Sequence, residues 1–154
     1  MEVWIGLGFT AVLLSLLAAL SYIDLKTYRL PNPLTLLLVL TGLIYALVTG
    51  SEMINHVIGM CLGYVVFVLI EKGFKAVTGK DGLGRGDAKL FAGAGAWLGW
   101  MGLPLVALIA SLSGIVMILA IQGLTKKQVE KFPFGPFLSI GIATVWIYNQ
   151  FILL

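Results

Sequence analysis

The sequence predicts an all-α integral membrane protein, a polytopic bundle of about six transmembrane helices of about 20 residues each. Of its 154 residues, 60% are hydrophobic and only 11% are charged, whereas soluble domains carry about 25% charged residues. The apolar residues fall into six runs that short polar segments separate. We expect the spans at residues 3–22, 34–48, 55–70, 88–100, 105–124 and 136–151.

The first two spans have distinct starting signals. Residues 3–22 are almost uninterrupted apolar sequence. This run is too long for the apolar core of a signal peptide and lacks a convincing small-residue cleavage site, so we expect it to remain as a span. The second span opens at Pro31, Asn32 and Pro33. Prolines are tolerated in the first helical turn, and Asn32 is the expected N-cap.

The remaining four spans are separated by polar or helix-breaking residues. The third ends at the polar stretch 71–87, and Pro104 marks the start of the fifth. The basic segment 125–131 precedes the sixth. The third span contains Gly59 and Gly63, and the fourth is rich in glycine and alanine. Such small-xxx-small spacings let helix backbones approach closely in lipid, so these two spans are expected to pack tightly.

The basic residues orient all six spans. The ten Lys and Arg residues lie between spans one and two, around the segment between three and four, and between five and six. The other two loops, 49–54 and 101–104, contain neither Lys nor Arg. By the positive-inside rule, the three basic segments face the cytoplasm and both termini face away from it. A single membrane-embedded domain, residues 1–154, accounts for the whole chain.

Composition also argues against several functional classes. Ten basic and seven acidic residues are too few to cover a soluble globule, and intrinsic disorder or a secreted disulfide scaffold is disfavoured. The net charge of +3 follows from membrane topology, so no nucleic-acid partner is expected. Cys61 is the single cysteine. It allows no internal disulfide, and with the distant His56 it cannot supply a tetrahedral zinc site. We therefore expect no metal and no other cofactor.

Two aspartates are the candidate catalytic residues. Asp24 follows the first apolar span and Asp87 begins the fourth, so the topology places both at the cytoplasmic boundary of the membrane. Acidic residues there are costly and are functional candidates by default. Two neighbouring carboxylates share one proton, because like charges close together resist ionising at once. One carboxylate can then accept a proton from water while the other polarises a scissile carbonyl, as in an aspartic protease.

Spacing alone leaves a second reading open, in which the two aspartates are unrelated. In this reading Asp24 pairs with Lys26 or Arg29, and Asp87 caps the fourth span. His56 lies near the outer end of the third span and is expected to be a packed or interfacial histidine, not a catalytic base.

The sequence around both aspartates resembles a known family. The run Gly-Arg-Gly-Asp that ends at Asp87 is similar to the GxGD motif of the type IV prepilin peptidases, a family of membrane aspartic proteases. Asp24 precedes a Pro-Asn pair, as in the family's first-aspartate segment. Residues 80–84 (Lys-Asp-Gly-Leu-Gly) and 132–137 (Phe-Pro-Phe-Gly-Pro-Phe) resemble two further family motifs. The resemblance therefore covers most of the chain.

The resemblance implies that Asp24 and Asp87 are the catalytic pair. It also implies a set of residues that bind substrate or shape the site: Gly84, Gly86, Asp81, Phe134, Gly135 and Pro136. Gly84 and Gly86 would leave an unhindered backbone beside Asp87 where an extended substrate approaches. The Phe-Gly-Pro run would form a backbone feature near the site.

The activity implied by the resemblance is that of a hydrolase, a prepilin peptidase. Such an aspartyl protease removes the short basic leader from type IV prepilins or pseudopilins, in type IV pilus or type II secretion systems. The bond that is cut follows a glycine and precedes an apolar helix. The resemblance further implies a multi-pass protein of the prokaryotic cytoplasmic (inner) membrane with its active site toward the cytoplasm. Its partners would be this substrate and membrane lipid.

Long members of the family carry an amino-terminal extension with two cysteine pairs, and they also methylate the cleaved product. This sequence resembles a short form without that extension, so N-methyltransferase activity is not expected.

Two other functions remain open at this point. A small transporter or channel subunit would use Asp24 and Asp87 as ion or proton ligands, but such a site is expected near the membrane midplane. An assembly scaffold for a pilus or secretion machine would tolerate Asp→Asn changes at both positions.

Overall fold

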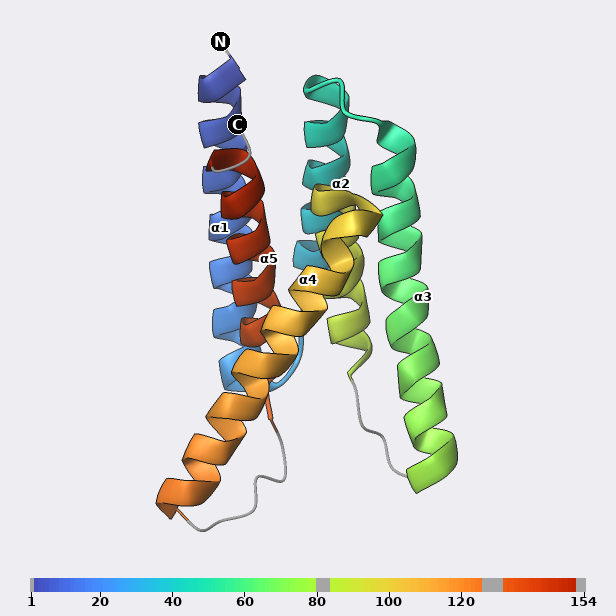
Figure 1. Ribbon diagram of the computed structural model, residues 1–154, viewed down its shortest axis with the longest axis vertical. Coiled ribbons are helices and arrows are strands. Elements are labelled where there is room, and N and C mark those ends of the chain that lie inside the picture. Colours follow the sequence, from blue (N-terminus) through green and yellow to red (C-terminus); the bar gives the residue numbers. More distant parts are fainter. Residues whose placement is uncertain (1, 80–83, 126–131, 152–154) are drawn as a thin grey trace.

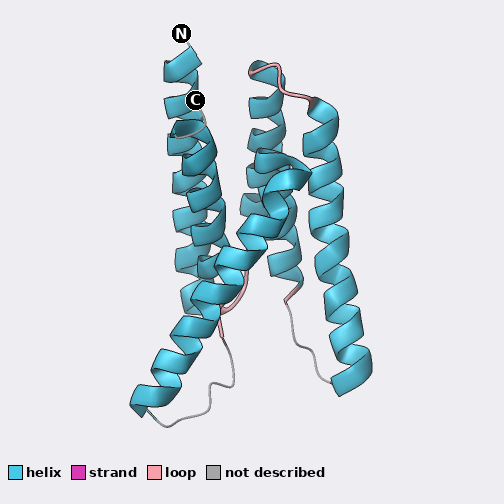
Figure 2. Ribbon diagram, in the orientation of Figure 1, coloured by secondary structure: helices cyan, strands magenta, loops and turns pink. Residues whose placement is uncertain are grey.

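The computed structural model describes residues 2–79, 84–125 and 132–151. These residues form five helices and no strand (Figures 1 and 2). The helices are α1 (Glu2–Thr27), α2 (Asn32–Val48), α3 (Met53–Thr78), α4 (Arg85–Thr125) and α5 (Gly135–Phe151). The expected all-α class is therefore confirmed for the described part of the chain.

Three of these helices are long and apolar enough to cross a membrane: Trp4–Thr27, Met53–Thr78 and Arg85–Leu124. The helix Asn32–Val48 is shorter but also apolar. The N-terminal end of α1 and the C-terminal end of α5 lie at the same end of the bundle (Figure 1). The described helices thus have the character of a membrane bundle, as the composition predicts.

Helix α4 contains a reversal where the sequence predicted a loop. Its ribbon runs along the bundle, turns sharply and runs back (Figure 1). The break falls at Gly99, whose φ of 69° and ψ of 179° are not helical. The predicted loop at 101–104 is wrong, because these residues are helical and Pro104 lies inside the second half of α4. A glycine with positive φ reverses the chain without a separate loop.

Two predicted helix boundaries also need correction. Asn32 is the first residue of α2 and not its N-cap; Pro31 is the N-cap, and no side chain caps this helix. The side-chain Oδ1 of Asn32 instead accepts a hydrogen bond of 2.6 Å from Lys89 Nζ. Helix α3 continues to Thr78, well into the polar stretch expected to be a loop. It ends at Gly79, where a left-handed φ of 69° forms the C-cap.

The predicted close packing of the third and fourth spans is confirmed. A Cβ added to Gly95 of α4 would lie 2.1 Å from the backbone carbonyl carbon and oxygen of Gly59 of α3. A Cβ on Gly63 would lie 2.6 Å from the carbonyl oxygen of Phe91. Glycine is required at these positions because the two backbones touch where a side chain would stand.

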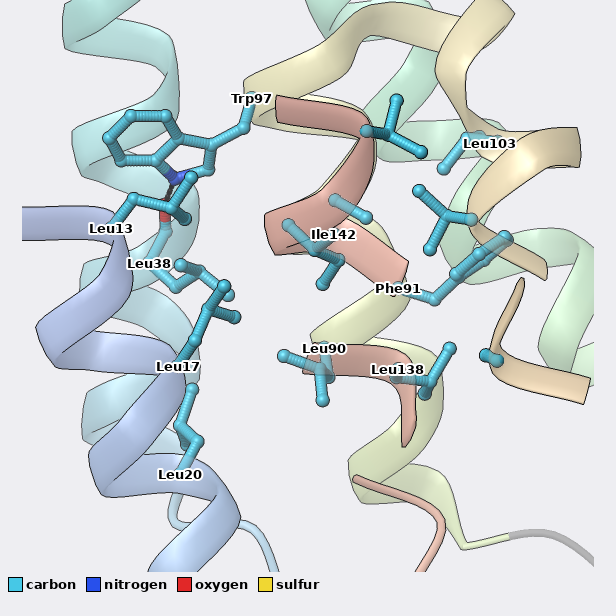
Figure 3. Close-up of a cluster of buried hydrophobic side chains, with 14 of the residues drawn as sticks. Leu13, Leu17, Leu20, Leu38, Leu90, Phe91, Trp97, Leu103, Leu138 and Ile142 are labelled. Atoms are coloured by element: carbon cyan, nitrogen blue, oxygen red, sulfur yellow. Dashed lines mark hydrogen bonds between the residues drawn. The ribbon is translucent and has the colours of Figure 1, made fainter. Parts of the chain in front are cut away.

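The core contains residues of all five helices, with both halves of α4 contributing. Leucines of α1 face side chains of α4 and α5 (Figure 3). The indole Nε1 of Trp97 donates a hydrogen bond of 2.8 Å to the carbonyl oxygen of Leu38, drawn as a dashed line in Figure 3. Trp146 Nε1 donates one of 2.9 Å to Thr10 Oγ1. Both buried indole groups are therefore satisfied, as polar groups in an apolar core must be.

Candidate active site

The structure brings Asp24 and Asp87 into one cavity of about 270 Å³. Asp24 lies in the last turn of α1, and Asp87 lies in the first turn of α4. The walls come from the end of α1, the connection to α2, the first residue of α2 and the start of α4: Asp24, Tyr28, Arg29, Leu30, Asn32, Gly84, Arg85, Gly86, Asp87 and Lys89. The cavity therefore sits at the ends of helices, not halfway along them.

Asp24 is held by the start of a distant helix. Its side chain is 5% exposed, and its Oδ2 accepts a hydrogen bond of 2.9 Å from the backbone N–H of Gly135. Gly135 is the first residue of α5, where backbone N–H groups have no partner inside the helix and the helix dipole is positive. Both effects stabilise a negative charge on Asp24.

The ion pair between Asp24 and Lys26, one part of the non-catalytic reading, does not match the geometry. Lys26 Nζ donates a hydrogen bond to the hydroxyl of Tyr22. It also lies 4.3 Å from the centre of the same ring, a cation–π contact. Lys26 thus faces a neighbour on its own helix surface, while Asp24 faces Gly135.

Asp87 is fixed through its backbone and faces the charge of Asp24. Its N–H donates a hydrogen bond of 3.0 Å to the carbonyl oxygen of Gly84. Its carboxylate is close enough to Asp24 for the two negative charges to interact unfavourably. One proton shared between the two carboxyl groups relieves that repulsion. The two carboxyl groups therefore line one cavity and interact through their charges.

A side chain at Gly135 would displace Asp24 from this arrangement. A Cβ added there would lie 2.7 Å from Asp24 Oδ2 and 3.1 Å from its carboxyl carbon. The flanking residues build the helix start: the carbonyl oxygen of Phe134 accepts hydrogen bonds of 3.1 Å from the N–H groups of Phe137 and Leu138. Pro136 occupies the first turn of α5, where its missing N–H costs little. Phe134 and Pro136 therefore present Gly135 to the aspartate.

The two motif glycines before Asp87 differ in their surroundings. A Cβ on Gly84 would meet only Asp87 Oδ2, at 3.5 Å, an ordinary contact distance. A Cβ on Gly86 would lie 3.0 Å from Leu30 Cβ. Leu30 of the connection between α1 and α2 therefore packs beside Gly86, which also lines the cavity. Asp81, another predicted site residue, lies outside the described residues.

Sequence reasoning missed several residues of the cavity wall. Arg85 and Lys89 were explained by topology alone, yet both line the cavity, as does Arg29, which was considered only as an ion-pair partner of Asp24. Arg85 Nε also lies 3.8 Å from Glu71 Oε1 of α3. Tyr28 has a left-handed φ of 53°, and its N–H bonds the carbonyl oxygen of Asp24 at 2.8 Å, which ends α1. The sequence does not predict this conformation, because tyrosine is uncommon in the left-handed region.

His56 is distant from this cavity, as expected from the sequence. Its Nδ1 lies 2.9 Å from the carbonyl oxygen of Ala96, and it lines a different cavity with Tyr45 and Trp97. Within residues 2–79, 84–125 and 132–151, no group of three or more His, Cys, Asp and Glu side chains is placed to hold a metal ion.

Known proteins have sequences similar to this chain. Residues 11–119 match the model of the type IV leader peptidase family. A prepilin leader peptidase/N-methyltransferase of Pectobacterium carotovorum subsp. carotovorum is 45% identical over 91% of this chain and 51% of its own length. Proteins with the same name from Aeromonas hydrophila and Escherichia coli (strain K12) are 44% and 42% identical, over 92% and 79% of this chain and 51% and 55% of their own lengths.

The chain thus spans about half the length of these curated relatives. No solved structure matches it. The family match covers both Asp24 and Asp87, and the relatives match over most of the sequence. The chain belongs to the type IV leader peptidase family.

Proposed function

We propose that this protein is a membrane aspartic endopeptidase that removes the short basic leader from type IV prepilins or pseudopilins. The single observation that carries the proposal is the shared cavity of Asp24 and Asp87, in a chain that belongs to a leader peptidase family. The two aspartates come from different helices, and they meet at the point where both helices end or begin. Such a convergence of two carboxyl groups supports peptide hydrolysis.

In the proposed reaction Asp24 is the base and Asp87 is the acid. The N–H of Gly135 favours the ionised form of Asp24, because a hydrogen bond to a carboxylate stabilises its charge. Asp24 accepts a proton from water, and the water oxygen attacks the scissile carbonyl carbon. Asp87 donates its proton to the carbonyl oxygen. When the C–N bond breaks, the proton held by Asp24 passes to the leaving amine, and one hydroxyl of the tetrahedral intermediate returns a proton to Asp87, so that a carboxylic acid is released and the pair regains its starting state.

The proposed topology has six crossings within one membrane-embedded peptidase domain, residues 1–154. The reversal at Gly99 supports it, because α4 then supplies two crossings. The three basic segments would face the cytoplasm of a prokaryotic cell, and both termini would lie on the other side of the inner membrane. The aspartate cavity would then open toward the cytoplasm, where a basic leader is retained by its own charge.

The cavity wall bears on how the leader is recognised. Three basic side chains, Arg29, Arg85 and Lys89, line it together with the two aspartates. A basic leader is therefore not captured by net attraction to this surface. We propose that local acidic groups guide it, with Asp81 and Glu71 as the candidates beside the catalytic pair.

The transporter alternative receives no support from the position of the aspartates. Asp24 is in the last turn of α1 and Asp87 in the first turn of α4, whereas transport sites are expected near the membrane midplane. The family match also favours a peptidase.

Co-expression with an Aeromonas hydrophila prepilin tests the proposed function. The expected result is a faster-migrating pilin band and a new amino terminus directly after a glycine. An unprocessed prepilin beside correctly inserted protein, under conditions in which the Aeromonas hydrophila relative cleaves it, would refute the proposal.

A further inference from the structure

A second cavity, of about 570 Å³, opens between α2, α3 and α4. Its walls are almost entirely apolar, in contrast to the aspartate cavity. We call it the apolar groove and define it by its lining residues: Asn32, Thr35, Leu36, Val39, Met60, Cys61, Tyr64, Val65, Lys89 and Ala92.

The lining residues follow the repeat of a helix face. On α2 they fall at positions 32, 35, 36 and 39, and on α3 at positions 60, 61, 64 and 65. Residues spaced by three, four and seven share one side of a helix. The groove therefore runs along α2 for about two turns, or about 10 Å at 1.5 Å per residue, and along α3 for a shorter stretch. This shape suits another helix, whose side chains can enter between α2 and α3.

The apolar groove joins the aspartate cavity at one end. Asn32 and Lys89 line both cavities, and Lys89 Nζ donates a hydrogen bond of 2.6 Å to Asn32 Oδ1. This polar pair connects α4 to α2 at the junction. Beyond it, the walls change from charged to apolar within one helical turn of Asn32.

We propose that the apolar groove binds the apolar helix of the substrate that follows the scissile bond. The inference rests on the proposed function, because that function supplies a substrate with a basic segment on one side of the bond and an apolar helix on the other. When the bond lies at Asp24 and Asp87, the basic segment leaves toward solvent and the apolar helix must enter the membrane. The groove offers an apolar path that starts at the aspartate cavity and runs along the helices.

The cavity at the other end of α2 does not fit this role. It is lined by Thr49, Ser51, His56, Asn149 and Gln150 together with aromatic side chains. Its walls also include apolar side chains such as Val48 and Leu98, but they are far more polar than those of the apolar groove, so polar groups would face an apolar helix without hydrogen-bond partners.

Disulfide crosslinking tests the groove directly, because Cys61 is the only cysteine of the chain, is exposed and lines the groove. The probe is an Aeromonas hydrophila prepilin with single cysteines placed in turn along its apolar helix. The catalytically inactive Asp24→Asn variant traps the complex. We expect crosslinks from one or two prepilin positions three or four residues apart, on one face of the substrate helix.

The matched control moves the thiol to the next residue. Leu62 is also exposed but does not line the groove. In the variant with Cys61→Ser and Leu62→Cys, crosslinks should fall at least about tenfold, the effect of a 1.4 kcal/mol difference in binding. Equal crosslinking at both positions, or none at Cys61, would overturn the proposal that the substrate helix binds in the apolar groove. Either result would indicate that lipid or no specific occupant lies there.

A second pair of variants tests the groove without crosslinking. Leu36 and Leu40 lie one turn apart on α2 and are both about half exposed, but only Leu36 lines the groove. Leu36→Trp should lower kcat/KM for the prepilin about tenfold, mainly through KM, whereas Leu40→Trp should leave it unchanged. Equal effects of the two variants would count against the groove.

These measurements separate the two proposals. Cleavage by the wild-type protein without crosslinks at Cys61 would support the peptidase function and refute binding of the substrate helix in the apolar groove. Crosslinks at Cys61 without cleavage by the wild-type protein would support a helix-binding groove and remove the peptidase function.

Discussion

The backbone N–H of Gly135 donates a hydrogen bond of 2.9 Å to Oδ2 of Asp24, although 111 residues separate the two in sequence. The bond connects the start of α5 to the last turn of α1. It fixes one carboxylate oxygen of Asp24. Because its donor is a backbone group at a helix start, its position is set by the whole packing of α5 on α1.

Gly135→Ala should inactivate the protein without unfolding it. The new Cβ would stand 2.7 Å from Asp24 Oδ2, so the carboxylate must move, and a shift of about 1 Å at a reacting group costs about 100-fold in rate. Gly8→Ala is the matched control, because nothing lies within 4 Å of a Cβ there. Prepilin cleavage in detergent at equal protein levels is the measurement. Normal cleavage by Gly135→Ala would show that this contact does not hold the site.

Asp24→Asn and Asp87→Asn should each abolish cleavage while the protein still inserts. Asn keeps the size and polarity of Asp but cannot exchange a proton with water or substrate. The double variant should be no worse than either single one, because a catalytic unit is already lost when one member is removed. Quantitative processing of a prepilin checks all three. Near-normal activity in either single variant would rule out the aspartic mechanism.

The rate of cleavage should depend on pH in a bell shape. Catalysis needs one ionised and one protonated carboxyl group, so the rate falls at low pH when the base takes a proton and at high pH when the acid loses its own. Both limbs belong to the pair of aspartates and not to either one. Initial rates across the pH range, with the folded fraction measured at each pH, give the profile. A profile without an alkaline limb would contradict a proton-donating aspartate.

Gly59→Ala should destabilise the helix bundle, and Gly73→Ala on the same helix should not. A Cβ at Gly59 would lie 2.6 Å from the carbonyl carbon of Gly99, whereas nothing lies within 4 Å of one at Gly73. Overpacking costs about 1–3 kcal/mol, but Ala in an open helical position stabilises by about 0.5–1 kcal/mol. The midpoint temperature of thermal unfolding in detergent should therefore fall for Gly59→Ala and should not fall for Gly73→Ala. Equal shifts would mean that α3 and α4 do not pack this closely.

Single cysteines should reveal the proposed topology. In a Cys61→Ser background, Thr27→Cys and Thr78→Cys should react with a membrane-impermeant maleimide only after the cytoplasmic side is opened. Ser51→Cys should react in intact cells, because the loop between α2 and α3 carries no basic residue. Labelling of Thr78→Cys and Ser51→Cys from the same side would contradict a membrane crossing by α3.

Much of the helical framework follows from local sequence. Apolar composition predicts a membrane bundle, and the runs of apolar residues place α2 and α5 to within two residues of their ends, whereas α1 continues five residues beyond the expected end. The predicted loop at 101–104 was wrong because the chain reverses earlier, at Gly99. A pattern of apolar residues does not predict the backbone conformation of a single glycine. The length of α3 was underestimated for a related reason. A helix can extend past the membrane into polar sequence, so hydropathy does not mark its end.

By itself, the sequence determined the membrane character of the chain, the two candidate aspartates and the motif that includes Gly135. Only the tertiary structure decided that Asp24 and Asp87 line one cavity, that Gly135 donates to Asp24 and that Leu30 fills the space beside Gly86. Composition, charge and apolar runs are properties of neighbouring residues, and the sequence displays them directly. Contacts between residues 24, 87 and 135 depend on how three helices pack, which is set by the shapes of many distant side chains acting together.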